Sequence, residues 1–255
     1  MYRLPRHLRS VAAALLLALV AAAPARAGGT ELPAPLAPFT AEYRLGNGSF
    51  RVGTSTLRLE PHARGWRYES VTEAEGLLAL FVDGPVVERT LLGPHAGRLR
   101  PLEYHHLEPD GDTRVLFDWA AGEARAHTPD GVRTIALAPD THDQFSVMLA
   151  VMQALAAGRD EVRLPGIDDE GEREPLSFAA EARETITVPL GRYDTVRVRR
   201  IRDGKRSTVT WLAPELGWLP VRVEQRKRGD LVARLELSAL NGEEAPPERR
   251  PGRRR

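Results

Sequence analysis

The sequence predicts a mainly β protein, with an antiparallel barrel-like or strongly curved sheet and one packed α-helix over residues 141–157. Three observations support this fold class. Apolar and polar residues alternate in many short runs, as they do on strands that bury one face. Turn residues separate these runs at intervals of roughly 8–12 residues, which is typical of sandwiches and barrels. One segment breaks the period of two and follows helical spacing instead.

The first strands are predicted from residue 39 onward. Apolar residues at every second position from 39 to 45 lead into Asn47-Gly48, a pair that favours a tight hairpin turn. In the next run, Gly53 precedes a change of phase toward Leu57 and Leu59. Such a change indicates a β-bulge, because one extra residue shifts every later side chain to the other face.

The same alternation continues to residue 240. The separators between runs contain Gly, usually with Asp, and these residues tolerate the backbone conformations of tight turns. The further predicted strands are 66–70, 86–92, 102–107, 113–119, 124–127, 132–137, 185–189, 193–201, 207–212, 219–224 and 231–237. An alternating strand has its apolar face packed inward, so these strands are expected to share one core.

The helix is predicted from apolar residues that recur at intervals of three and four. These residues are Phe145, Met148, Leu149, Met152 and Leu155. Thr141 is the expected N-cap, and Gln144 three residues later would complete a capping box. Gly158 follows the predicted end, where a left-handed residue is common. A single amphipathic helix in a strand-rich chain is expected to pack on the sheet.

Residues 1–27 are predicted to be a secretory signal peptide. Three arginines precede an apolar run over 11–22, and Ala25 and Ala27 are small residues before a cut at Gly28. The run is shorter than the roughly 20 residues of a membrane span. Residues 28–38 are then expected to be a linker, 39–240 a single β-rich domain, and 241–255 a disordered tail rich in Pro and Arg.

Charge and cysteine content exclude several classes of protein. The formal charge is +1, and removing the four arginines of residues 1–27 leaves about −3 (+1 − 4), which is not the basic balance of a nucleic-acid binder. The chain has no cysteine, so it forms no disulfide and offers no site for lipoprotein attachment. No second apolar run is long enough to anchor the protein in a membrane after signal cleavage.

Several stretches resemble a family of bacterial exported β-proteins known only as a domain of unknown function. They are 39–45, 143–149 (DQFSVML), 186–191 (ITVPLG) with 196–198 (VRV), 210–212 (TWL) and 217–222 (GWLPVR). The resemblance covers most of the chain after residue 38. It implies a periplasmic location and an all-β, barrel-like architecture, and it supplies neither an activity nor catalytic residues.

The sequence predicts no metal site and no cofactor. His105 and His106 are adjacent on a predicted strand, so their rings would point to opposite faces rather than toward one ion. The acidic stretch 168–170 lacks the spacing of a calcium-binding loop and is expected to be a solvated loop.

No catalytic residue is predicted either. His142, Asp143 and Ser146 are the residue types of a hydrolytic triad, but on one helix Asp143 would leave toward another side and could not orient the imidazole. These residues are therefore interpreted as a capped helix start with an acid near its positive end.

Aromatic residues are the candidate binding residues. Residues on an apolar strand face usually belong to the core, but in an incompletely filled barrel some would line a ligand cavity. The four candidates are Trp66, Tyr68, Trp211 and Trp218. The last two flank a turn and are expected near the rim of a barrel.

The leading hypothesis is a noncatalytic periplasmic protein that binds an apolar or envelope-derived molecule, such as a lipid, or supports envelope maintenance through a protein partner. One alternative is a structural or protein-interaction module that uses a sheet edge or the acidic loop. The other is a hydrolase whose carboxylates and histidines, such as His105, assemble only in space.

Overall fold

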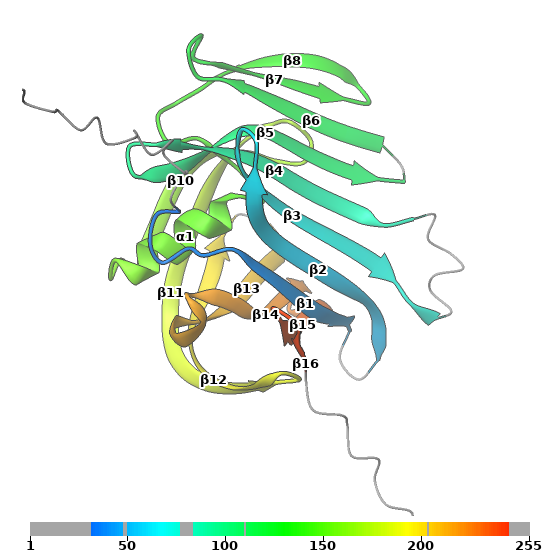
Figure 1. Ribbon diagram of the computed structural model, residues 1–255. Helices are drawn as coiled ribbons and strands as arrows, with labels where there is room; N and C mark the ends of the chain where they lie inside the picture. Colours follow the sequence, from blue (N-terminus) through cyan, green and yellow to red (C-terminus); the bar gives the residue numbers. More distant parts are fainter. Residues whose placement is uncertain (1–31, 48–49, 77–83, 110, 203, 245–255) are drawn as a thin grey trace, which may run out of the picture. The chain divides into compact units, whose positions relative to one another are not determined.

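The computed structural model describes residues 32–47, 50–76, 84–109, 111–202 and 204–244 (Figure 1). The predicted signal peptide, the first four residues of the predicted linker and most of the predicted tail lie outside these residues. The predicted fold class is confirmed: the described chain is mostly β, with one α-helix, α1 (Val147–Ala156). None of its helices is both long and apolar enough to cross a membrane.

Strands before the helix form one continuous meander. They are β1 (Phe39–Gly46), β2 (Arg51–His62), β3 (Gly65–Ala74), β4 (Val86–His95), β5 (Arg98–Glu108), β6 (Gly111–Asp118), β7 (Glu123–Thr128) and β8 (Gly131–Ala136). Each pairs antiparallel with its neighbour in the chain. The short strand β9 (His142–Asp143) then leads toward α1.

Strands after the helix form a second meander. They are β10 (Glu161–Ile167), β11 (Arg173–Val188), β12 (Gly191–Ile201), β13 (Arg206–Ala213), β14 (Leu219–Lys227), β15 (Asp230–Leu240) and β16 (Glu243–Glu244). The two meanders join through an antiparallel ladder between β1 and β15, which makes one large sheet. The one parallel pair among the described strands is β9 with β10.

The sheet curves strongly but does not close. Its path runs from β8 at one end to β10 and β9 at the other, and no ladder joins these ends within the described residues. Two arginines bridge the gap instead. Arg133 of β8 places Nη1 2.5 Å from Glu172 Oε1, and Arg173 Nη2 donates to the carbonyl of Ala136 at 2.6 Å. These contacts cover part of the free edge of β8, which would otherwise offer unpaired backbone groups.

The predicted hairpin and bulge after residue 39 are both confirmed. β1 and β2 pair antiparallel, and their register shifts where Leu45 faces Gly53 but Gly46 faces Arg51. Val52 is therefore the extra residue. Beyond it, Gly53, Ser55, Leu57 and Leu59 all lie buried on one face, as the change of phase predicted.

The predicted start of the helix is wrong. α1 begins at Val147 rather than near Thr141, because His142 and Asp143 pair with Gly166 and Ile167 of β10 and cannot be helical there. The capping box does not form, since the Thr141 hydroxyl donates to Ala138 O at 2.8 Å. The predicted C-terminal end of the helix is correct to within one residue, and the predicted left-handed glycine follows it.

That end lies at Ala156, one residue before the C-cap Ala157. Gly158 adopts a left-handed conformation with φ of +76° just past the cap. Six of the ten helix residues are buried, so α1 packs within the curve of the sheet beside β10 and β11 (Figure 1). The helix thus fills part of the inner face and leaves the rest to other side chains.

The core divides into two clusters. The larger one surrounds α1 and the inner faces of β1–β3 and β11–β15, and the smaller one lies along β5–β8. Phe145 packs against both. Leu36 of the predicted linker is buried in the larger cluster, and β16 extends the sheet four residues beyond the predicted domain end at 240.

Candidate functional site

A cleft of about 270 Å³ opens on the inner face of the sheet. Its walls come from both meanders, from the turn before α1 and from the first turn of α1. The alternation of side chains along a strand explains why these residues face the cleft. Ser55 and Leu57 of β2 are two positions apart and so share one face, as do Tyr68 and Ser70 of β3. Across the cleft, the Tyr43 hydroxyl donates to the carbonyl of Pro220 at 2.8 Å and ties β1 to β14.

One part of the cleft wall is apolar. Its residues are Tyr43, Leu57, Tyr68, Phe145, Met148, Pro220, Val223 and Leu235. The rings of Tyr68 and Phe145 stack with centroids 4.3 Å apart and planes 18° apart. This stack fixes the orientation of both rings, since offset aromatic pairs have a preferred geometry. The apolar wall is therefore a surface of defined shape.

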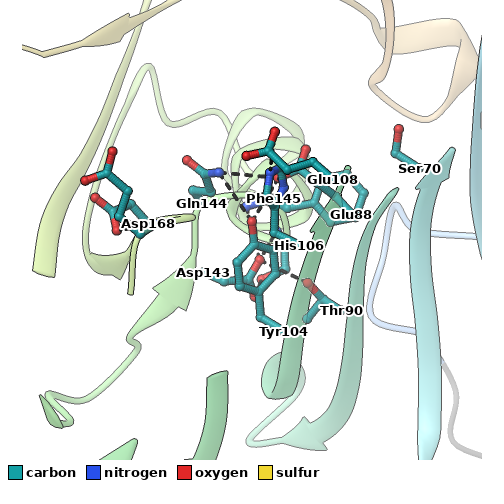
Figure 2. A network of polar contacts seen from close by, with 12 residues as sticks. Ser70, Glu88, Thr90, Tyr104, His106, Glu108, Asp143, Gln144, Phe145 and Asp168 are labelled. Carbon is teal, nitrogen blue, oxygen red and sulfur yellow. Dashed lines mark hydrogen bonds and ion pairs between the residues drawn. The ribbon is translucent and has the colours of Figure 1, made fainter. Parts of the chain in front are cut away.

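Another part of the wall is polar, and Glu88 is its centre (Figure 2). Glu88 Oε1 accepts hydrogen bonds from the Tyr104 hydroxyl at 3.0 Å and from Gln144 Nε2 at 3.4 Å, and His106 Nδ1 lies 3.8 Å from the same oxygen. These contacts all reach one carboxylate oxygen. The side chain remains 29% exposed because it borders the cleft.

The surroundings of Glu88 favour its protonated form. Burial raises the pKa of Glu88, while the neighbouring His106 and the hydrogen bond from Tyr104 oppose this, and Asp143 and Asp169 raise it further. Burial and the nearby Glu88 likewise raise the pKa of the Tyr104 phenol, so Tyr104 stays a hydrogen-bond donor. The cleft thus presents a carboxyl group that gains a proton more easily than an exposed one.

Arg200 of β12 supplies the second charged group of the cleft wall. It continues the inward row of Val196 and Val198, and only 11% of its side chain is exposed. Arg200 Nη2 lies 2.5 Å from Glu174 Oε2, but Arg200 Nε has no hydrogen-bond partner among the described residues. Burial lowers the pKa of Arg200, and Glu174 opposes that shift. A buried donor is therefore left free beside the cleft.

Asp143 is fully buried and serves the structure rather than the cleft. Its Oδ1 accepts from Thr90 Oγ1 at 3.0 Å and from the amides of Phe145 and Ser146 at 3.0 and 2.7 Å. Its Oδ2 accepts from the Ser146 hydroxyl at 2.6 Å. Burial raises the pKa of Asp143, and these hydrogen bonds lower it. Asp143 therefore orders the turn before α1 and fastens it to β4.

The contacts of His142, Asp143 and Ser146 do not follow the order of a hydrolytic triad. The Ser146 hydroxyl donates to Asp143, and His142 Nδ1 lies 3.3 Å from the same hydroxyl. Serine thus stands between the other two, whereas a triad needs histidine in that place. Ser146 is also fully buried, and burial lowers the pKa of His142 to about 4. The predicted capped helix start is also wrong, because these residues lie before α1, whose N-cap Ser146 makes no side-chain capping hydrogen bond.

The two adjacent histidines face opposite sides of β5. His106 lies beside Glu88, whereas His105 lies 3.8 Å from Asp112 of β6, and burial lowers the pKa of His105. In the part of the chain that the structure describes, no three His, Cys, Asp or Glu side chains are grouped to hold a metal ion. Asp168 of the acidic stretch instead accepts from the amides of Glu170 and Glu172 within its own turn.

Of the four aromatic candidates, only Tyr68 lines the cleft. Trp66, two residues before it, is buried in the larger core cluster. Trp211 follows the cleft residue Thr210 and so points to the other face, where its Nε1 donates to Glu184 at 2.9 Å. Trp218 lies in the turn after the 3-10 helix η2 (Pro214–Leu216) and packs against the core.

Sequence reasoning did not find Glu88, Gln144, Phe145 or Arg200 as cleft residues. Phe145 and Gln144 were assigned to the helix pattern, and Glu88 lies within an ordinary strand run. For Arg200 a signal existed, because it is the charged member that ends the row Val196, Val198, Arg200. A charge in an inward row of a strand points to a functional or ion-paired position.

A family model described as protein of unknown function (DUF3108) matches residues 39–236. No curated protein matches the chain. Among solved structures, a beta-barrel-like protein of domain of unknown function DUF1849 from Brucella abortus is similar with a TM-score of 0.53 at 13% identity, covering 80% of this chain and 97% of that one. This similarity supports the barrel-like fold.

Two further structures are similar at lower scores. A candidate lipoprotein from Parabacteroides distasonis has a TM-score of 0.33 at 11% identity, covering 80% of this chain and 95% of that one. A candidate exported protein with a YmcC-like fold from Bacteroides fragilis has a TM-score of 0.30 at 12% identity, covering 80% and 93%.

Proposed function

The chain belongs to the DUF3108 family of proteins of unknown function, and from that premise we propose that it is a noncatalytic periplasmic protein that binds one small amphipathic molecule in the cleft. The observation that carries the proposal is the cleft itself, which combines apolar side chains with polar and charged ones on the concave face. Small-molecule sites are typically concave and mostly apolar, with a few placed polar groups that orient the ligand.

The apolar part would hold a hydrocarbon portion of the ligand. Tyr43, Leu57 and Leu235 come from different strands yet border the same space, together with the stacked pair of Tyr68 and Phe145. A ligand that covers these side chains gains roughly 25 cal/mol for each Å² of apolar surface removed from water. At about 270 Å³, the cleft suits a single short chain or a small ring system rather than a whole diacyl lipid.

The polar part would hold a head group. Glu88 and Arg200 both border the cleft, and Arg200 Nε has no hydrogen-bond partner among the described residues. Leaving a buried polar group without a partner costs about 1–3 kcal/mol, so a ligand that supplies partners is favoured. A pure hydrocarbon would leave this cost in place.

The geometry supports binding over hydrolysis. Glu88 is the one carboxylate among the described residues that line the cleft, and the nearest imidazole, His106, does not line it. Asp143 uses both of its oxygens in structural hydrogen bonds. Hydrolysis by carboxylates needs a second acid or base on the opposite side of the reacting bond.

The periplasmic location rests on residues 1–27, whose charged start, apolar run and small residues fit an export signal. A ligand from the cell envelope, such as a lipid or a lipid fragment, would be the natural occupant there. Binding of a ligand in this cleft is compatible with a second role, in which the protein acts through a protein partner.

The test is native mass spectrometry, with organic extraction, of protein purified from the periplasm. Thr208→Phe would fill the cleft from β13, and Ser207→Phe would place the same ring on the opposite face of that strand. We expect one discrete apolar mass on the natural protein and on the Ser207→Phe variant, and none on Thr208→Phe. A bare protein in every case, or retention by Thr208→Phe, would contradict the proposal and direct attention to protein partners.

A further inference from the structure

Arg200 occupies an unusual position for an arginine. Its side chain follows the inward-facing Val196 and Val198 near the end of β12, and only 11% of it is exposed. Glu174 takes one of its terminal nitrogens, and Arg202 Nη2 approaches the same carboxylate at 3.4 Å. The guanidinium is therefore held in place by a neighbour outside the cleft wall, while Nε remains without a partner.

Several acidic side chains act on Arg200. Glu174, Asp168 and Asp169 act on it electrostatically, as does Arg202. Among the charged groups with the largest effect on Arg200, carboxylates outnumber guanidinium groups, and this acidic surplus extends to Glu88, on which Asp169 also acts. An additional carboxylate or phosphate would be repelled by this surplus, whereas an uncharged oxygen could accept a hydrogen bond without adding charge.

We propose that Arg200 is the specificity-determining residue of the cleft, and that its guanidinium donates to an uncharged oxygen acceptor, such as an ester carbonyl or a hydroxyl, on the head of the bound molecule. This inference rests on the proposed function. It narrows the ligand class to uncharged amphiphiles that carry oxygen. Plain hydrocarbons and ionised fatty acids fall outside this class.

The experiment measures displacement of the apolar fluorescent probe N-phenyl-1-naphthylamine at pH 8 by methyl decanoate, 1-decanol, sodium decanoate and decane. Arg200→Met removes the guanidinium and its charge, and Arg200→Lys removes the guanidinium but keeps a positive charge beside Glu174. Arg202→Met is the matched control, because Arg202 contacts the same carboxylate but does not line the cleft.

We expect both Arg200 variants to bind methyl decanoate and 1-decanol about tenfold or more weakly, which is the effect of losing a hydrogen bond from a charged donor. Binding of decane should not change, and Arg202→Met should behave like the natural protein. Sodium decanoate should bind the natural protein more weakly than methyl decanoate does.

Other outcomes overturn the inference in distinguishable ways. Equal binding of the ester by all variants would refute the role of Arg200 and leave the proposed function standing. Tighter binding of decanoate than of its ester would refute the uncharged head. If the natural protein binds neither the fluorescent probe nor any of the four compounds, the proposed function fails together with the inference.

Discussion

The ring of Phe145 lies stacked on the ring of Tyr68, at the point where the turn before α1 meets β3. The same Phe145 packs against both core clusters and lines the cleft. One side chain therefore connects the helix, the two halves of the core and the candidate site. A change at this position is expected to affect stability and binding together.

Phe145→Ala should lower the free energy of unfolding by about 3 kcal/mol, near the lower end for Phe-to-Ala changes, because Phe145 is only partly buried. Urea denaturation followed by tryptophan fluorescence measures this loss. Phe50→Ala is the matched control, since Phe50 is 74% exposed and should change the free energy by less than about 0.5 kcal/mol. Equal midpoints for both variants would contradict the connecting role of Phe145.

Asp143→Asn should destabilise the protein by about 2–3 kcal/mol. Asparagine keeps the shape, but its amide nitrogen cannot accept a hydrogen bond, so a buried donor among Thr90, Phe145 and Ser146 loses its partner. Asp140→Asn serves for comparison, because the Asp140 carboxylate is 54% exposed and its 3.4 Å ion pair with Arg98 is worth little. A smaller loss for Asp143→Asn than for Asp140→Asn would contradict the role of Asp143 in holding the turn before α1.

His142 should make the protein less stable as the pH falls. Its folded pKa is lowered to about 4, from an ordinary 6.5, so the unfolded chain binds the extra proton first and stability is lost between these two values. The loss from pH 7 to pH 5 should be about 2 kcal/mol. Urea midpoints at both pH values should differ less for His142→Gln, whereas the exposed His127→Gln should leave the difference unchanged.

Glu88 should act with the opposite sign. Its folded pKa is raised above the ordinary 4.5, so the folded state holds the proton longer and its stabilising effect is lost as the pH rises through the raised value. Glu88→Gln keeps an uncharged side chain at every pH. Its free energy of unfolding relative to the natural protein should therefore increase from pH 4 to pH 8, and a difference that stays constant over this range would contradict the raised pKa.

Much of the fold could be predicted from local patterns. The alternation around Tyr43, the phase change at Gly53 and the glycine after the helix each follow from the steric demands of one element. The helix start could not, because Thr141 and Gln144 form a valid local signal that pairing of His142 and Asp143 with β10 overrides. Long-range pairing decided the conformation there.

The site was harder to predict than the fold. Tyr68 was named from its residue type, but Glu88, Gln144 and Arg200 come together only through the curvature of the sheet and lie up to 112 residues apart in the chain (200 − 88). A single sequence contains no sign of that proximity. The inward direction of Arg200 was readable from its row, but its free Nε and its acidic surroundings depend on β11 and the turn after β10.

The ladder between β1 and β15 has a consequence for how the cleft comes into being. Among the described strands, it is the one pairing in the sheet path that joins strands far apart in the chain, and Thr40 and Asn241 clamp it with two reciprocal hydrogen bonds. Every other neighbouring pair along that path is consecutive and can form stepwise. Closing this last ladder therefore carries the large entropy cost of a long loop.

Because the cleft takes its walls from β1–β4 on one side and β12–β15 on the other, neither meander alone can contain it. A ligand can bind in the cleft only when the two meanders are joined through the β1–β15 ladder. By mass action, bound ligand therefore stabilises this ladder against opening. Ligand binding and formation of the β1–β15 ladder are therefore thermodynamically coupled. A ligand-bound protein should take longer to unfold at this ladder than a ligand-free one.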